Sequence, residues 1–222
     1  MASEHSRSGP ETAAADKYLS DEMSVMLIDD FETSPHWEQY LDGKVSQSDD
    51  FEHGGKYSLK KDNSNDPHGG CRTFDVIVPA HFIFSGWLYR PSEGMRGVAE
   101  HLAVEDNRGC GYGFCVSHKI DGLVVYAIEV RENGICTENI GDVLALRNDP
   151  LKDVWYNFYF QLTESGILHF GLNVSGRGPR GILTKDSRYR KFTRVAVHGG
   201  HPYYVDDIQI ISWKPKKHLK NQ

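Results

Sequence analysis

The sequence lacks the long apolar run and the dense cationic patch that membrane-spanning and nucleic-acid-binding proteins require. No stretch approaches the roughly 20 consecutive apolar residues of a membrane helix. The formal net charge is −6, and lysine and arginine form no cluster in the body of the chain. Binding to a phosphate backbone needs a concentrated cationic surface. We therefore expect neither a membrane span nor a nucleic-acid partner.

Helical periodicity is also missing. No window of about a dozen residues places apolar side chains at i, i+3, i+4 and i+7, so we expect at most a single turn near residues 38–41. No internal repeat of fixed period occurs, which excludes propellers and solenoids.

Cysteine is scarce and is not spaced for a metal site. The four cysteines are Cys71, Cys110, Cys115 and Cys136, and no pair has CxxC spacing, which argues against zinc and thioredoxin-type centres. Two states of these thiols are compatible with the sequence. Cys110 and Cys115 can form a bridge inside a glycine-rich hairpin, or the cysteines can be buried as free thiols.

The length and composition fit one domain between two polar ends. A chain of 222 residues with 39% hydrophobic residues is large enough to bury a core without disulfide or metal cross-links. Residues 1–22 are polar and aperiodic, which is typical of a disordered leader or a cloning remnant. Residues 214–222 form a basic tail. Residues 23–213 are predicted to be the folded domain.

Short β-branched and aromatic runs, separated by Gly, Asn, Asp and Pro, make up the chain beyond residue 24. The predicted strands are 25–32, 56–60, 72–78, 81–90, 98–105, 111–118, 122–131, 154–163, 166–174, 192–198 and 203–212. About eleven strands with tight connections favour two packed sheets. We predict an all-β fold, an antiparallel β-sandwich.

Period-two alternation assigns two faces to each predicted strand. The predicted core faces are Val154, Tyr156, Phe158, Phe160 and Leu162; Leu168, Phe170, Leu172 and Val174; Val124, Tyr126, Ile128 and Val130; and Val195 with Val197. The side chains between them would point away from the core.

The outward faces mix flat rings with bidentate hydrogen-bonding groups. Sugars need both, because the C–H face of a pyranose stacks on an aromatic ring while its hydroxyls bind amide, carboxylate and guanidinium groups. We therefore predict a carbohydrate site on the concave face of the sandwich. Its predicted residues are Trp87, Tyr89, Glu129, Arg131, Trp155, Asn157, Tyr159, Gln161, His169, Asn173, Arg194 and His198. In the alternative, Trp87 and Trp155 lie in the core, since a register slip of one residue exchanges the two faces.

Three motifs near the ends of the chain resemble carbohydrate-binding modules and lectin-like domains of the jelly-roll and concanavalin A-like type. Residues 28–32 (IDDFE) and 53–60 (HGGKYSLK) are similar to two of their strands, and 203–210 (YYVDDIQI) to their last strand. The resemblance implies a sandwich with adjacent first and last strands, a carbohydrate ligand, and an extracellular or periplasmic location.

The same resemblance implies a structural calcium site. Asp30, Glu32 and Asp207 are its candidates, and hard oxygen ligands of this kind suit Ca²⁺. In the alternative, these carboxylates cap turns or accept hydrogen bonds from backbone amides.

The sandwich also carries enzymes in other proteins, so the fold alone does not decide between binding and catalysis. A lyase acting on an acidic polysaccharide needs a Tyr or His base and a group that neutralises the substrate carboxylate. The candidates for these roles are His169, Tyr159, Arg131, Asn157 and His198. A glycoside hydrolase needs two flanking carboxylates, and only Glu129 and, less clearly, Glu105 are available.

A third class is a structural or protein-interaction sandwich, with the basic 175–191 loop as the contact for a protein partner. We predict carbohydrate binding ahead of lyase activity, and lyase activity ahead of hydrolysis.

Overall fold

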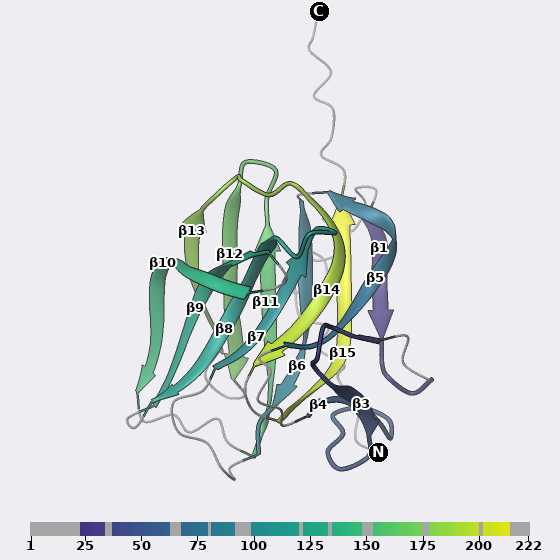
Figure 1. Ribbon diagram of the computed structural model, residues 1–222. Helices are drawn as coiled ribbons and strands as arrows, with labels where there is room; N and C mark the ends of the chain where they lie inside the picture. Colours follow the sequence, from purple (N-terminus) through teal and green to yellow (C-terminus); the bar gives the residue numbers. More distant parts are fainter. Residues whose placement is uncertain are drawn as a thin grey trace, which may run out of the picture.

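The computed structural model describes residues 23–33, 37–62, 68–79, 81–91, 99–119, 122–132, 135–147, 153–174, 178–199 and 202–213. Within these ranges the chain forms fifteen strands and no helix, arranged as two antiparallel sheets packed face to face (Figure 1). The predicted leader 1–22 and tail 214–222 lie outside the described residues. No helix long and apolar enough to cross a membrane occurs in the described part of the chain.

The eight-stranded sheet has the order β13-β12-β11-β6-β15-β4-β3, with β1 also paired to β15. Its strands are β1 (Met23–Asp29), β3 (Val45–Ser48), β4 (Ser58–Lys61), β6 (Phe82–Tyr89), β11 (Trp155–Leu162), β12 (Ile167–Val174), β13 (Gly178–Lys185) and β15 (Tyr203–Trp213). The first and last strands are therefore neighbours, as predicted.

The seven-stranded sheet has the order β10-β9-β8-β7-β14-β5-β2. Its strands are β2 (Glu38–Gln39), β5 (His68–Pro79), β7 (Ala99–Glu105), β8 (Gly111–Lys119), β9 (Gly122–Arg131), β10 (Ile135–Arg147) and β14 (Lys191–Gly199).

Four strands were not predicted: β2, β3, β10 and β13. The first two are short, and β2 occupies the position where a single helical turn was expected. Two register shifts interrupt the pairing of β10 with β9, so its sequence alternates poorly. β13 lies inside the predicted 175–191 loop, because glycine, proline and arginine resemble a connection until pairing with β12 supplies the hydrogen bonds of a strand.

The core between the sheets confirms the predicted alternation in β11 and β12. Tyr156, Phe158, Phe160, Leu162, Leu168, Phe170 and Leu172 are buried. Val154 was predicted to join them but precedes β11 and is 45% exposed. The side chain of Val174 lies outside the described part of the structure.

The predicted core face of β9 was wrong, because the side chains that point into the main core are shifted by one residue. Val125 and Ala127 face the main core, whereas Ile128 and Val130 pack with Ala103 and Cys115 in a separate small cluster. Both faces of this strand are apolar, so alternation does not distinguish them.

Three cysteines are buried free thiols: Cys71, Cys110 and Cys115. The bridge considered between Cys110 and Cys115 is therefore not formed. The side chain of Cys136 lies outside the described part of the structure.

At one lateral edge of the sandwich, the two sheets approach each other through β10 and β13 (Figure 1). A Cβ atom on Gly141 would lie 2.6 Å from the Cβ of Thr184, so glycine permits this approach. Gly141 also has a φ of 102°, which a side chain would strain.

The connection from β13 to β14 carries the chain from one sheet to the other and is held by a polar network. The Asp186 carboxylate accepts hydrogen bonds from the Arg188 Nε, at 2.8 Å, and from the Tyr112 hydroxyl. Arg188 also donates to Glu129 at 2.7 Å, and the Tyr189 hydroxyl donates to Glu129 at 2.8 Å. Burial alone would raise the pKa of Asp186, but the hydrogen bonds from Arg188 and Tyr112 lower it to about 2. Folding therefore favours the ionised carboxylate.

We predict that Asp186→Asn lowers the free energy of unfolding by about 1–2 kcal/mol at neutral pH. A carboxylate whose pKa falls on folding stabilises the protein above its unfolded pKa of 3.8, and this stabilisation is lost as the pH falls toward 2. Urea denaturation between about pH 7 and pH 3 should show the difference between variant and wild type shrinking as acid is added. The exposed Asp49→Asn is the matched control, and an equal effect of the two variants at neutral pH would contradict this assignment.

Candidate carbohydrate-binding face

Pairing of β6, β11 and β12 brings eight of the twelve predicted ligand-binding residues onto one surface, the outer face of the eight-stranded sheet. We use this term for the surface turned away from the seven-stranded sheet. The eight residues are Trp87, Tyr89, Trp155, Asn157, Tyr159, Gln161, His169 and Asn173. Neither Trp87 nor Trp155 lies in the core, so the alternative assignment of the two faces does not hold.

The middle of this face carries a hydrogen-bonded Tyr159–His169 pair above a glycine. The Tyr159 Oη and His169 Nε2 atoms are 3.1 Å apart. A Cβ atom on Gly181 would lie 2.5 Å from the Tyr159 Oη and 2.8 Å from the His169 Nε2. Gly181 therefore leaves the space that the pair occupies.

Small residues continue this row across the sheet. Tyr159 is paired with Ser85 on one side and with Gly171 on the other, and Gly171 is paired with Gly181. These small neighbours let the Tyr159 side chain lie across the sheet, so that its hydroxyl reaches the space above Gly181.

The Tyr159–His169 pair is neutral at physiological pH. Burial raises the pKa of Tyr159 above its usual value and lowers the pKa of His169. A neutral imidazole and a phenol offer both donor and acceptor atoms, which is what sugar hydroxyls require.

Side-chain amides flank the pair. Asn157 donates to the backbone oxygen of Gly86 at 2.9 Å, which fixes the orientation of its amide. Asn173 is exposed and Gln161 is half-buried, and neither has an assigned side-chain hydrogen bond among the described residues. These amides are therefore available to a ligand.

Two of the predicted aromatic platforms are covered by the chain itself. The His53 ring stacks on Trp87 with centroids 3.8 Å apart and an interplanar angle of 18°. Phe51 stacks on Tyr89 at 4.5 Å, and Tyr89 is buried. Trp155 meets His53 by its edge, with centroids 5.7 Å apart, and the Tyr89 ring lies 5.3 Å away at an interplanar angle of 45°. Trp155 is thus a half-exposed indole of this face on which no ring stacks in parallel among the described residues.

Carboxylates near both ends of the sandwich domain hold the covering segment, residues 49–57. Glu32 accepts hydrogen bonds from the backbone N–H groups of Lys56, at 2.6 Å, and Tyr57, at 2.8 Å. Asp206 accepts from the backbone of His53 at 3.0 Å, and the His53 ring lies 2.8 Å from Asp207. A bulge in β15 between Asp206 and Gln209 lets both aspartates reach the segment.

Glycine is required in this segment. Gly55 has a φ of 69°, and a Cβ atom there would overlap the Glu32 carboxylate. The HGGK motif identified in the sequence is therefore explained by its contact with Glu32.

The predicted calcium ligands Asp30, Glu32 and Asp207 lie around this segment. Asp30 accepts the backbone N–H of Glu32 at 3.1 Å, so all three carboxylates take part in local hydrogen bonds. In the described part of the chain, no three His, Cys, Asp or Glu side chains are placed to hold a metal ion. Carboxylate oxygens are of the type that Ca²⁺ binds, and calcium binding at this segment stays a prediction.

Calcium binding predicts that millimolar Ca²⁺ raises the melting temperature relative to EDTA, because a ligand that binds only the folded state stabilises it. Glu32→Gln should abolish the difference, since the amide oxygen still caps the segment but loses the charge that Ca²⁺ needs. The check is a thermal unfolding series of both proteins. Identical melting in Ca²⁺ and EDTA would assign these carboxylates to holding the segment alone.

The structure does not bring four predicted residues onto this face. Glu129 is buried beside Arg188 and Tyr189. Arg131, at the end of β9, donates a hydrogen bond of 2.8 Å to the Glu129 carboxylate. The cause is the inverted parity of β9, which turns Glu129 inward.

Arg194 and His198 lie on the seven-stranded sheet. The Arg194 Nε and the His198 Nε2 bind the buried Glu105 carboxylate at 3.0 and 2.8 Å. The Tyr40 ring covers them, with the Arg194 guanidinium 4.3 Å from its centroid. They belong to β14, which pairs in the other sheet, so they cannot join the outer face of the eight-stranded sheet.

The basic 175–191 segment is not a free cationic loop. Arg188 is paired with Asp186 and Glu129, and Arg190 donates to the backbone oxygen of Glu164. The side chains of Arg177 and Arg180 lie outside the described residues. A protein partner at this segment stays a prediction.

Sequence reasoning missed the residues that shape the face: Phe51, His53, Ser85 and Gly181. The HGGK motif marked the position of His53, but no local pattern shows that a segment will fold over a distant strand. Gly181 could have been found only by pairing β13 with β12.

Comparison with known proteins finds one sequence relative and no family. No family model matches the chain. The chain is 34% identical to the uncharacterized protein MJ1394 of Methanocaldococcus jannaschii over 195 residues, and this alignment covers 87% of the chain. The chain spans only about a fifth, 19%, of that protein's length.

Solved structures with the same architecture are diverged in sequence. Carbohydrate-binding module CBM66 from Bacillus subtilis superposes with a TM-score of 0.56 and 15% identity, covering 79% of this chain and 95% of that one. The globular domain of T. cruzi calreticulin superposes with a TM-score of 0.58 and 13% identity, covering 87% of this chain and 89% of that one. A legume lectin-like domain from Entamoeba histolytica superposes with a TM-score of 0.50 and 10% identity, covering 77% of this chain and 90% of that one. The fold is therefore a jelly-roll, concanavalin A-like β-sandwich of the kind found in carbohydrate-binding modules and lectin-like domains.

Proposed function

We propose that the chain binds a carbohydrate on the outer face of its eight-stranded sheet. The observation that carries the proposal is the neutral Tyr159–His169 pair above Gly181, with the Asn157 and Asn173 amides on the adjacent row. A pyranose ring placed beside it would meet an aromatic surface and several orienting hydrogen-bond groups at once.

The aromatic contact comes from Trp155 and Tyr159. Both are half-buried, and they lie four positions apart on β11, so their rings emerge on the same side of the strand. A chain of sugars lying along β11 would pass both rings with the amides of Asn157 and Gln161 beside them. This arrangement supports binding of an oligosaccharide rather than a single sugar.

The shared fold adds weight to this proposal. A carbohydrate-binding module and a lectin-like domain have the same architecture, although their low identity transfers no ligand or residue role to this chain. We propose an extracellular or periplasmic location on the same grounds, because free polysaccharide is found there.

We predict that Trp155→Ala weakens binding at least tenfold, because truncating a central aromatic contact removes both stacking and buried area. A glycan array would identify the ligand, and affinity electrophoresis through that glycan would measure retention. Trp213→Ala is the matched control, since Trp213 is also a half-buried indole, at the far end of β15. Equal retention of both variants and the wild type would contradict the assigned face.

A polysaccharide lyase is the second candidate, and the contact between Tyr159 and His169 favours it. In β-elimination, His169 would accept the proton next to a uronate carboxylate, the Tyr159 hydroxyl would protonate the leaving oxygen, and Asn157 would donate to the carboxylate. The other two candidates, Arg131 and His198, lie on the seven-stranded sheet. The described part of this row therefore has no cation for the substrate, and binding is the better supported function.

We expect no ultraviolet absorbance from unsaturated uronate when the protein is incubated with alginate, polygalacturonate or hyaluronan. Product that forms with the wild type and the Trp213→Ala control but not with His169→Ala would replace binding by lyase activity as the function.

A further inference from the structure

The imidazole of His53 stands beside the half-exposed indole of the outer face. Its ring stacks on Trp87 with centroids 3.8 Å apart, and it meets Trp155 at 5.7 Å with an interplanar angle of 70°. Asn157 is paired with Trp87 and lies two positions from Trp155, so its amide emerges next to both side chains. Trp155, His53 and Asn157 therefore form a corner, in which the two steeply inclined rings are the walls.

Asp207 orients the His53 ring in this corner. The His53 Nδ1 atom lies 2.8 Å from the Asp207 carboxylate. An ionised carboxylate only accepts hydrogen bonds, so Nδ1 carries the hydrogen and donates it. The other ring nitrogen, Nε2, has no assigned partner among the described residues, and the His53 side chain is 27% exposed. Nε2 is therefore an oriented group to which a sugar hydroxyl can bond.

The backbone on both sides of this contact is shaped to hold it. Asp207 lies in the β15 bulge with a φ of 48°, a left-handed conformation that aspartate tolerates better than most residues. A Cβ atom on Gly54 would lie 3.2 Å from the Asp207 carboxylate, so glycine lets the covering segment come close. The buried Asp206 accepts the backbone N–H groups of His53, at 3.0 Å, and Gly54, at 3.3 Å. His53 is thus held in place before any ligand binds.

The charge around the corner disfavours anionic sugars. Glu32, Asp206 and Asp207 hold the covering segment, and among the described residues no lysine or arginine forms an ion pair with them. A uronate or sulfate group bound at Nε2 would face the negative charge of Asp207 across the imidazole ring and would be repelled. A neutral hydroxyl group does not meet this repulsion.

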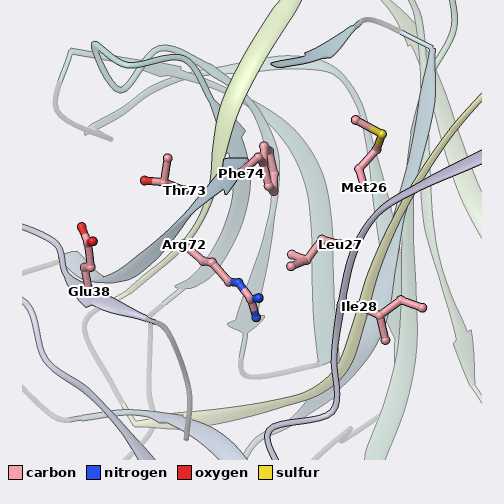
Figure 2. A pocket seen from close by; sticks show the side chains of 7 residues that line it. All are labelled: Met26, Leu27, Ile28, Glu38, Arg72, Thr73 and Phe74. Carbon is pink, nitrogen blue, oxygen red and sulfur yellow. The ribbon is translucent and has the colours of Figure 1, made fainter. Parts of the chain in front are cut away.

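Away from the corner, the outer face continues without charged side chains in the row beside Asn157. That row consists of Ile28, Gln209, Ser85 and Tyr159. Figure 2 shows that Ile28 lies on the opposite side of β1 from Leu27 and Arg72, which line a cavity of about 550 Å³ between β1 and β5. A neutral glycan chain that begins at the corner can therefore continue over an uncharged part of the outer face.

We propose that His53 is a ligand-binding residue of the outer face and gives it a preference for neutral glycans. One sugar ring stacks on Trp155, and one of its hydroxyl groups bonds to the Nε2 atom of His53. Asp207 is a positioning residue, because it acts only through the His53 ring. This role rests on the proposed carbohydrate binding and adds the residue that selects the sugar.

The test on the wild-type protein follows the imidazole nitrogen resonances of isotope-labelled protein during titration with cellotriose, xylotriose and mannotriose, and with trigalacturonate as the anionic probe. We expect at least one neutral triose to shift the His53 Nε2 resonance together with the backbone amides of residues 155–159. Trigalacturonate should shift neither. Amide shifts at 155–159 without a shift of Nε2 would overturn the role of His53 and leave the carbohydrate face intact. Stronger shifts with trigalacturonate would overturn the preference for neutral glycans, and no shift with any triose would overturn both proposals.

A variant of His53 tests the contact directly. His53→Phe keeps a ring that stacks on Trp87 but removes both nitrogens, so we expect about 5- to 10-fold weaker binding of the triose in calorimetry. His81→Phe is the matched control, because His81 is also a half-buried histidine against an indole, 4.1 Å from Trp213. Wild-type affinity of His53→Phe would refute the contact. Should this variant not fold, the wild-type titration decides.

A variant of Asp207 tests the positioning. Asp207→Asn keeps the size of the side chain, but an amide can donate as well as accept and so no longer dictates which ring nitrogen carries the hydrogen. We expect about threefold weaker binding, together with changed nitrogen resonances of His53 in the free protein. A purely structural role of Asp207 would leave those resonances in place, and that result would overturn its assignment.

Trp155→Ala separates this role from the proposed function. If Trp155→Ala and His53→Phe both lose retention on the polysaccharide, both proposals stand. If only Trp155→Ala loses it, the outer face binds carbohydrate and His53 is not a contact. If only His53→Phe loses it, the sugar does not stack on Trp155 and the corner is refuted.

Discussion

The burial of aromatic side chains between two twisted sheets is the interaction on which this structure depends. The ring centroids of Phe84 and Phe158 lie 5.2 Å apart inside the sandwich, and both side chains are completely buried. Because successive side chains in a strand point in opposite directions, this burial forces Asn157 and Tyr159 onto the outer face. The candidate site is thus a direct consequence of how the core is filled. A change of register that moved Tyr159 would also expose the core.

Glycine contributes to both the core and the site by allowing backbones and rings to approach. In the core, Gly86 faces Phe158, where a Cβ atom would lie 3.0 Å from the end of that ring. On the outer face, the missing side chain of Gly181 leaves the space that the Tyr159 and His169 side chains occupy. Larger residues at these positions would satisfy the strand pairing equally well but would fill the space that the rings need.

The two lateral edges of the sandwich serve different purposes. Close contact between β10 and β13 at Gly141 and Thr184 closes one edge. At the other edge, β1 and β5 stay apart and leave the cavity around Arg72. The Asp29–Arg72 pair bridges this gap from one sheet to the other, so a single ion pair both ties the sheets together and shapes the cavity.

The sequence by itself determined the fold class and the two faces of β11 and β12, whereas the adjacency of the first and last strands was implied only by the resemblance of its terminal motifs to carbohydrate-binding modules. β11 and β12 each have one apolar and one mixed face, so the need to bury one of them leaves a single solution. Only the tertiary structure decided the parity of β9, which is apolar on both faces, and the formation of β13 within the 175–191 segment, which depends on pairing with β12. It also decided that His53 covers Trp87 and that Arg194 binds Glu105. These contacts join residues far apart in the chain, so their energies depend on which strands become neighbours and leave no periodic trace in the local sequence.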